Sequence, residues 1–201
     1  MLSRDDIIKI LKDSNALMEG HFILTSGLHS GQYIEKFRIL EKPRYTEMLC
    51  KDIAEFFRKN NVSVVVGPMT GGIILAYEVA RQLGVKSIFT ERVDGKMKFK
   101  RGFKLNEQDR VLIVEDIITT GGSIFEVIEE VNKFKSNIIG LGYLIDRSNG
   151  KVKFPIPSHP LLTLNIESYT KDECPFCEAG VTAVKPGSTN KCCYLLFTTI
   201  G

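Results

Sequence analysis

Residues 111–123 read Val-Leu-Ile-Val-Glu-Asp-Ile-Ile-Thr-Thr-Gly-Gly-Ser, and this stretch decides the fold class. Four aliphatic side chains in a row are typical of a strand that is buried on both faces of a parallel sheet. Two acids, Glu115 and Asp116, follow them, and a hydroxyl- and glycine-rich turn then leads into a helical pattern. Such a turn presents backbone N–H groups at a helix N-terminus, which suits a phosphate monoester. The stretch therefore predicts an α/β fold with an anion site beyond the strand.

The rest of the chain repeats this alternation of apolar strands and amphipathic helices. In open α/β sheets, ligands bind beyond the carboxyl ends of the strands. In the second helix we expect Met48, Leu49, Ile53, Phe56 and Phe57 to face inward. Residues 20–40 are predicted to form short strands and turns, and the secondary structure after Asn149 is not predicted. The expected helices cover about residues 5–18, 45–59, 72–83 and 124–134, and the expected strands about residues 62–66, 87–89, 111–114 and 138–145.

The composition is that of an ordinary globular protein. The chain has 201 residues, 43% hydrophobic and 25% charged, which fits one domain or one domain with a small appendage. A net charge of +3 is too small to indicate a nucleic-acid or membrane partner. No apolar run approaches the roughly 18 residues that a membrane span needs, and the acidic N-terminus is unlike a signal peptide. We therefore expect a cytoplasmic protein.

A second glycine-rich turn lies one strand–helix unit upstream, in residues 64–72, which read Val-Val-Val-Gly-Pro-Met-Thr-Gly-Gly. Such a loop can offer main-chain amides to a diphosphate, although a tight strand–helix turn is the simpler alternative. For residues 111–123 the simpler alternative is a buried strand that leads into a capped helix. Two adjacent acids between aliphatic pairs make that alternative costly, because burying unpaired carboxylates is unfavourable.

Both turns resemble those of a known superfamily. Residues 111–123 resemble the phosphoribosyl-pyrophosphate motif of type I phosphoribosyltransferases, and residues 64–72 resemble their pyrophosphate-binding loop. The resemblance implies the α/β fold of that superfamily, a central and mostly parallel sheet flanked by helices, with an N-terminal hood. It implies that phosphoribosyl pyrophosphate is bound by Glu115, Asp116, Ile117, Ile118, Thr119, Thr120, Gly121, Gly122 and Ser123. The pyrophosphate part of this substrate is expected to contact Pro68, Met69, Thr70 and Gly71.

Residues 20–34 are similar to the N-terminal signature of orotate phosphoribosyltransferases, in which this segment forms part of a hood over the base. The similarity places Tyr33 at the base. Arg147, after the fourth strand, resembles the family residue that binds the orotate carboxylate, with Thr119 as its partner. A guanidinium suits a carboxylate because it donates paired hydrogen bonds. The alternative role of Arg147 is a surface ion pair with Asp146, without any contact to orotate.

The resemblance also implies a mechanism and partners. Displacing pyrophosphate from ribose C1 builds charge on both groups, so positioning and charge neutralisation by the protein and Mg²⁺ are expected to drive the reaction. Glu115 and Asp116 are expected to act catalytically at the ribose hydroxyls. The basic segment 91–110 is expected to be a long loop that closes as a lid and, in a homodimer, reaches the partner's site. Arg92, Lys96 and Lys98 are its expected ligands to phosphoribosyl pyrophosphate, with Lys96 catalytic; a solvated loop face is the alternative.

The resemblance covers residues from about 5 to 187 and predicts a single phosphoribosyltransferase domain over residues 1–201. Residues 1–40 contribute approximately the hood, and residues 168–201 approximately a cysteine-containing extension. Cys174 and Cys177, with the adjacent pair Cys192-Cys193, can supply four thiolates to a structural zinc ion, or all four can be ordinary thiols. The three histidines, His21, His29 and His159, show no ligand spacing and are expected to be structural or exposed.

Two other functions remain open. A purine phosphoribosyltransferase shares both phosphate loops, so the acceptor base is the point of difference. A regulator of the same fold that binds nucleotide or RNA without turnover is the second alternative. The intact acidic pair and the basic segment favour an enzyme, and the N-terminal signature favours orotate.

Overall fold

The computed structural model describes residues 1–24 and 26–186, which form two compact units. The larger unit comprises Met1–Ala16 and Glu35–Asn165. The smaller unit comprises Leu17–Ile34 and the described residues that follow Asn165. A six-stranded sheet lies in the larger unit and a two-stranded sheet in the smaller one.

The six strands of the large sheet follow the order β5-β4-β3-β6-β7-β8. All neighbouring pairs are parallel except β4 and β5, which are antiparallel. The prediction of a mostly parallel α/β sheet is therefore confirmed. The strands are β3 (Val64–Pro68), β4 (Lys86–Val93), β5 (Lys96–Phe99), β6 (Arg110–Ile118), β7 (Asn137–Asp146) and β8 (Ser158–Thr163).

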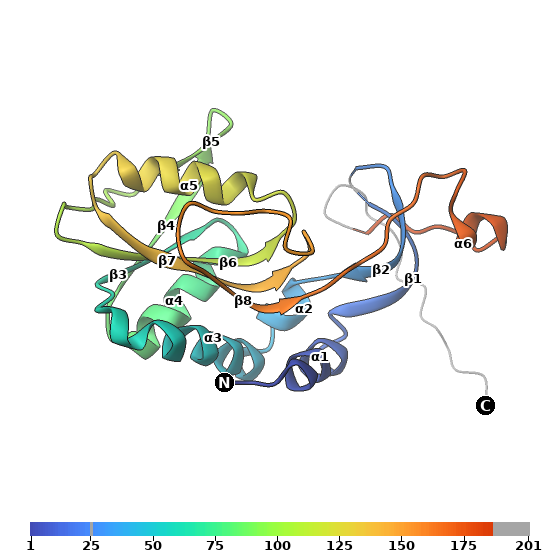
Figure 1. Cartoon of the computed structure of the whole chain (residues 1–201), viewed down its shortest axis with the longest axis horizontal. Helices are drawn as coiled ribbons and strands as arrows, with labels where there is room; N and C mark the ends of the chain where they lie inside the picture. The colour runs from blue at the N-terminus through green and yellow to red at the C-terminus, as the bar shows by residue number, and fades with distance from the viewer. Residues whose placement is uncertain (25, 187–201) are drawn as a thin grey trace. The chain divides into compact units, whose positions relative to one another are not determined.

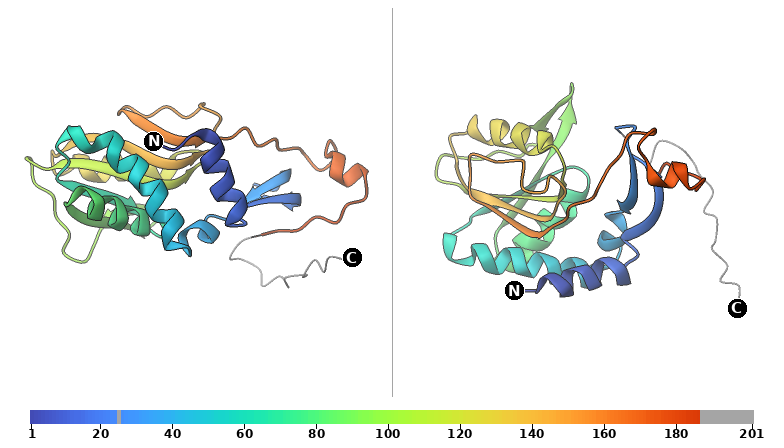
Figure 2. Two further views of the ribbon diagram at one scale, coloured as in Figure 1. Left: turned by 90° about the horizontal axis from the view of Figure 1, so that it is seen from below. Right: turned by 45° about the vertical axis from the view of Figure 1, so that its right-hand side comes forward.

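Helices cover both faces of this sheet. Figure 1 shows α5 on one face and α3 with α4 on the other, and the second view of Figure 2 agrees. In α5 the apolar residues Ile124, Val127, Ile128 and Val131 are spaced by three or four positions, so they form one buried stripe. The helices of this unit are α1 (Arg4–Asp13), α2 (Phe37–Leu40), α3 (Pro43–Phe57), α4 (Gly71–Leu83) and α5 (Gly122–Asn132), with a 3₁₀ turn at Arg58–Asn60.

The strand order predicts a ligand site between β3 and β6. The chain leaves β3 for β4 on one side, whereas β6 and then β7 lie on the other side. The winding direction thus reverses between these two neighbouring strands, and ligands of open α/β sheets bind at such a reversal. Both glycine-rich turns follow these two strands, because they connect β3 to α4 and β6 to α5.

One predicted core residue is wrong. Phe56 was expected to face inward with Phe57, but Phe56 is 47% exposed and Phe57 only 2%. Consecutive helical residues point about 100° apart, so the two rings cannot both enter the core. The Phe56 ring instead stacks on the His159 ring, with their centroids 3.8 Å apart.

The basic segment is not the long irregular loop that the sequence suggested. β4 continues to Val93 and turns back into β5, so residues 86–99 form an antiparallel hairpin. The outer edge of β5 is bound by α5: the N–H of Met97 donates to Glu126 (3.0 Å) and that of Phe99 to Glu130 (3.1 Å). These bonds satisfy edge amides that would otherwise be unpaired. Residues 100–109 contain no helix or strand.

The smaller unit is built on an antiparallel hairpin of β1 (Leu17–Ile23) and β2 (His29–Ile34). The segment after Asn165 pairs with both strands, since Val184 bridges to Phe22 and Tyr169 to His29. A single helical turn, α6 (Pro175–Glu178), lies between these two bridges. Among all the described residues of both units, no helix combines the length and the hydropathy that crossing a bilayer requires.

Candidate active site

The turn after β6 has the conformation that an anion cradle needs. Gly121 is the N-cap of α5 and has a positive φ of 77°. A Cβ at Gly121 would lie 2.8 Å from Val152 and 3.0 Å from Phe154, so the position requires glycine on both grounds. Because the first turn of a helix leaves its N–H groups without intrahelical partners, this turn can donate to an anion.

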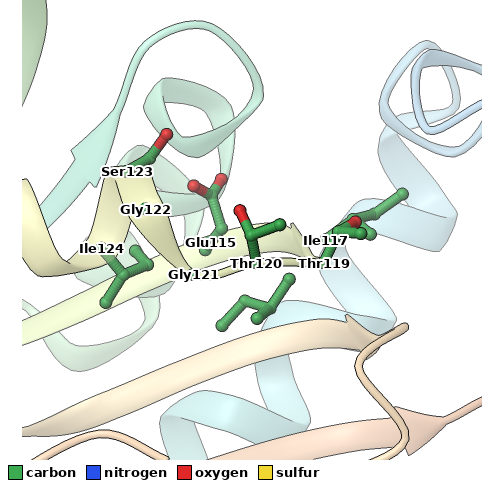
Figure 3. A pocket seen from close by; sticks show the side chains of 9 residues that line it. Glu115, Ile117, Thr119, Thr120, Gly121, Gly122, Ser123 and Ile124 are labelled. Carbon is green, nitrogen blue, oxygen red and sulfur yellow. The ribbon is translucent and has the colours of Figure 1, made fainter. Parts of the chain in front are cut away.

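A cavity of about 150 Å³ opens at this turn. In Figure 3 the hydroxyl groups of Thr120 and Ser123 and the carboxylate of Glu115 point to the same side of the turn. The cavity thus combines backbone donors, hydroxyl groups and one carboxylate, as a phosphorylated sugar requires. Its lining consists of Glu115, Ile117, Ile118, Thr119, Thr120, Gly121, Gly122, Ser123 and Ile124. These include eight of the nine residues of the predicted motif 115–123, all but Asp116, and none of the three predicted basic ligands.

The acidic pair is buried but has polar partners. Glu115 is 8% and Asp116 2% exposed. The Lys36 ammonium lies 2.8 Å from one carboxylate oxygen of Asp116 and 3.1 Å from the other. The Glu115 carboxylate accepts the N–H of Asp116 at 2.9 Å, and the Asp116 carboxylate accepts the N–H of Ile117 at 2.6 Å. Strand β6 extends through both acids, beyond the predicted end at Val114, because these contacts satisfy them inside the sheet.

Burial and neighbouring charge act in opposite senses on these groups. Burial, followed by the Asp116 charge, raises the pKa of Glu115 well above that of an ordinary carboxyl. Burial alone would lower the pKa of Lys36, but the Asp116 carboxylate outweighs it, so the pKa of Lys36 is raised. Lys36 is therefore held in its protonated form beside the Asp116 carboxylate, and Glu115 binds a proton more readily than an ordinary carboxyl does.

The turn after β3 packs directly against the acidic pair. A Cβ at Gly71 would lie 1.9 Å from a carboxylate oxygen of Asp116, so only glycine allows this approach. A Cβ at Gly67 would likewise lie 2.0 Å from the carbonyl oxygen of Gly72. The N–H of Met69 donates to the carbonyl of Thr90 at 2.9 Å, which fixes the turn to β4. The two predicted phosphate loops are thus neighbours in space.

Comparisons with known proteins agree with this geometry. Residues 39–154 match the phosphoribosyl transferase domain family. An orotate phosphoribosyltransferase from Caldicellulosiruptor saccharolyticus is 50% identical over 187 residues, which cover 93% of this chain and 98% of the relative. The chain belongs to the orotate phosphoribosyltransferase family. Members of this family are glycosyltransferases of UMP biosynthesis.

Solved structures share the fold of this orotate phosphoribosyltransferase family member. The orotate phosphoribosyltransferase of Aeropyrum pernix has a TM-score of 0.64 and 24% identity, covering 79% of this chain and 93% of that one. An adenine phosphoribosyltransferase from Trypanosoma brucei, solved with AMP, pyrophosphate and ribose-5-phosphate, has a TM-score of 0.60 and 13% identity, covering 81% and 82% of the two chains. The fold is therefore common to enzymes that use different bases, and the choice of base depends on individual residues.

Three residues, Thr119, Arg147 and Tyr33, were predicted to contact orotate in this family member. Arg147 directly follows β7, and its N–H donates to the carbonyl of Ile118 at 2.8 Å, so it lies beside the start of the phosphate turn at Thr119. The Asp146 carboxylate accepts hydrogen bonds from the N–H and hydroxyl of Ser148, both at 2.7 Å, and thereby shapes the turn after β7. Tyr33 lies in the smaller unit, where its ring is 5.7 Å from that of Phe22.

The predicted basic ligands of this family member lie on or next to the β4–β5 hairpin. Arg92 pairs with Glu126 at 3.1 Å, Lys98 with Asp94 at 3.6 Å, and Arg101 with Glu91 at 2.7 Å. Lys96 is exposed, and the ion pairs among residues 1–24 and 26–186 do not include it. Of the three predicted ligands on the hairpin, Lys96 is therefore the one that no acid of the described residues holds.

Two groupings of side chains could not be predicted from the sequence. Lys36 was not selected, because nothing in the sequence marks a contact across 80 positions. His21 and His29 were expected to have no metal-ligand role, yet they lie beside Cys174 and Cys177 in the smaller unit. The spacing of eight residues between the histidines shows no pattern by itself, but the turn between β1 and β2 brings them together. Cys192 and Cys193 lie outside the described residues.

Proposed function

We propose that this chain transfers the 5-phosphoribosyl group from phosphoribosyl pyrophosphate to orotate, giving orotidine 5′-monophosphate and diphosphate. The observation that carries the proposal is the neighbouring position of two anion sites. The phosphate turn begins at Thr119, and Arg147 follows the adjacent strand, joined to it by the bond from the Arg147 N–H to the Ile118 carbonyl. A sugar phosphate and a carboxylate-bearing base fit such a pair. Membership of the orotate phosphoribosyltransferase family supports this choice of base.

Each part of the site has a role in this reaction. The turn at residues 119–123 holds the 5-phosphate through its amides and hydroxyls, and the Gly71 turn receives the diphosphate. Glu115 and Asp116 accept hydrogen bonds from the ribose hydroxyls and hold the sugar so that C1 faces the acceptor nitrogen. Orotate attacks through a ring nitrogen that has already lost its proton, so no side chain needs to form a covalent bond with the sugar. Positioning and charge neutralisation then account for the catalysis.

The residues at the acidic pair fit a magnesium ion held mainly by substrate. Asp116 is already paired with Lys36, which leaves the cavity-facing carboxylate of Glu115 and nearby hydroxyls for a cation or its waters. Mg²⁺ commonly keeps several waters and binds through one or two carboxylates and substrate phosphates. When bound, it supplies positive charge to the departing diphosphate.

We further propose that the chain acts as a homodimer in which the β4–β5 hairpin completes the partner's site. The exposed ammonium of Lys96 at the start of β5 supports this role, since an unpaired cation on a projecting hairpin can reach a diphosphate. Arg92 and Lys98 are held by acids of the same chain, so they would need to exchange partners to bind the ligand.

A steady-state assay with orotate, phosphoribosyl pyrophosphate and Mg²⁺ tests this function, with adenine and hypoxanthine as alternative acceptors. We expect turnover when orotate is the acceptor and no turnover when adenine or hypoxanthine replaces it. Arg147→Ala should raise the KM for orotate at least tenfold, because a charge-assisted hydrogen bond contributes roughly 1.5–3 kcal/mol, and leave the KM for phosphoribosyl pyrophosphate nearly unchanged. Arg58→Ala is the control, since Arg58 pairs with Glu55 on an exposed helix end. Turnover with a purine instead of orotate would overturn the assignment.

A further inference from the structure

The smaller unit contains a buried cluster of two histidines and two cysteines. His21 lies on β1 and His29 on β2, whereas Cys174 is the N-cap of α6 and Cys177 lies within that helix. One ligand atom from each side chain can be chosen so that all four lie within 4.8 Å of one another. We propose that these four side chains bind one structural Zn²⁺ ion. The four ligands belong to the smaller unit, whereas both phosphate loops belong to the larger one, so the proposal does not depend on the proposed reaction.

The distances between the ligand atoms suit a tetrahedral ion. With Zn–N of about 2.05 Å and Zn–S of about 2.3 Å, tetrahedral geometry separates a nitrogen and a sulfur ligand by about 3.6 Å. The His21 Nε2 atom lies 3.5 Å from the Cys174 sulfur and 3.7 Å from that of Cys177. The His29 Nδ1 atom lies 3.3 Å from the Cys177 sulfur. The two ring nitrogens, 2.7 Å apart, need to separate by only about 0.6 Å to reach the tetrahedral spacing.

The surroundings of His21 prepare it as a ligand. Its Nδ1 atom lies 2.7 Å from the carbonyl oxygen of Val181, and because a carbonyl only accepts, Nδ1 must carry the proton. The Nε2 atom then directs its lone pair toward the thiols when the ring is neutral. Metal-bound histidines usually donate their second ring N–H to a carbonyl or carboxylate in this way.

Main-chain bonds hold both histidines to the segment that supplies the cysteines. The N–H of Val184 donates to the carbonyl of His21, and His29 exchanges both of its backbone bonds with Tyr169, each at 2.8 Å. Phe176, inside the Cys174–Cys177 pair, stacks on the His21 ring at 5.6 Å. A Cβ at Gly31 would lie 2.6 Å from the Phe176 ring, so the close packing around the cluster depends on glycine there.

Burial gives the ion a structural purpose. Cys174, His21 and His29 are 2%, 4% and 5% exposed, respectively. Besides Cys174, the buried apolar side chains among the described residues of this unit are Phe22 and Ile34. A two-stranded hairpin with so small a core is marginal in water, and a metal ion is a common way to stabilise such a unit. The ion would join β1 and β2 to the chain around α6.

The ligand set indicates zinc in a closed site. Two thiolates and two imidazoles form a common structural zinc set, and four protein ligands leave no position open for a substrate. The set contains no carboxylate, which argues against magnesium or calcium. It also revises the sequence-based ligand set, because the histidines take the places that had been given to Cys192 and Cys193.

Metal analysis of full-length variants tests the proposal. The wild-type chain, purified without chelator, should hold one zinc per chain, and His21→Gln and Cys174→Ser should each lose it. Cys192→Ser/Cys193→Ser should keep it, and His159→Gln is the histidine control. Zinc lost from the double cysteine variant but retained by His21→Gln would overturn the proposed ligands in favour of four thiolates.

Two measurements on the wild-type chain cover the case in which the ligand variants do not fold. Replacement of zinc by Co²⁺ should give the visible spectrum of a tetrahedral ion with thiolate charge transfer from two sulfurs. Chelator should lower the melting temperature, and added zinc should restore it. The site would be refuted if the chain with reduced thiols took up neither zinc nor Co²⁺ and if chelator left its melting temperature unchanged.

Discussion

Replacing Gly121 by alanine tests the phosphate turn most informatively, because the chain provides a matched control. Gly121 has a φ of 77° and Gly84, at the end of α4, a φ of 72°. A Cβ at Gly121 would press on Val152 and Phe154, whereas a Cβ at Gly84 would meet nothing within 4 Å. The two variants therefore share the backbone strain and differ in packing and in distance from the site.

The expected magnitudes follow from these contacts. A left-handed conformation costs a non-glycine residue roughly 1–2 kcal/mol, which applies to both variants. The crowding at Gly121 adds roughly 1–3 kcal/mol, as overpacked sites usually do. We therefore expect unfolding free energies lowered by about 2–5 kcal/mol in Gly121→Ala and about 1–2 kcal/mol in Gly84→Ala. Both losses are smaller than the stability of many domains, so both proteins should fold under mild conditions.

Urea unfolding measures the stability of each variant, and isothermal titration calorimetry measures its affinity for phosphoribosyl pyrophosphate. Gly121→Ala should bind this substrate at least tenfold more weakly, since one lost amide contact to a charged phosphate is worth about 1.5–3 kcal/mol. Gly84→Ala should bind it like the wild-type chain. Wild-type affinity in folded Gly121→Ala would show that the turn does not enclose the phosphate and would refute this reasoning.

Three further predictions concern charged residues. Lys96→Ala should lower kcat far more than it raises either KM in steady-state kinetics, whereas an unchanged kcat would exclude Lys96 from the reaction. Lys36→Met should destabilise the fold by about 1–3 kcal/mol in urea unfolding, because it leaves the Asp116 carboxylate buried without its counter-ion; an unchanged midpoint would mean that the pair is energetically neutral. Glu115→Gln should weaken the dependence of stability on pH. Burial raises the pKa of Glu115 to about 8 from 4.5, so between these values the folded state binds more protons than the unfolded state, and wild-type stability falls as the pH rises through this window. Equal losses of stability between pH 5 and pH 8 in both proteins would contradict that assignment.

The parts of the fold that the sequence predicted are those encoded by contiguous residues. The phosphate turn, its strand and its helix lie within residues 110–132, so local periodicity and glycine placement suffice to find them. β5 was missed because its Lys-Met-Lys-Phe sequence also reads as a charged loop, and its pairing depends on glutamates of α5. β8 was missed because Pro160 lies inside it, which is unfavourable for a strand unless it lies at a sheet edge, as here.

The site was predicted less completely, since several of its contacts join distant positions. Lys36 meets Asp116 only because the segment between β2 and α2 reaches the end of β6. The histidine–cysteine cluster joins residues more than 140 positions apart, through a strand pairing that leaves no local pattern. Phe56 and Phe57 show a related limit, because hydrophobicity alone does not decide which of two adjacent rings enters the core.

A crystal structure with ribose 5-phosphate bound tests the central claim most directly. We expect the phosphate to lie within hydrogen-bond distance of backbone N–H groups in residues 119–123, with Glu115 and Asp116 facing the ribose hydroxyls. A ligand bound elsewhere, with this turn empty and the two carboxylates directed away from the sugar, would contradict it.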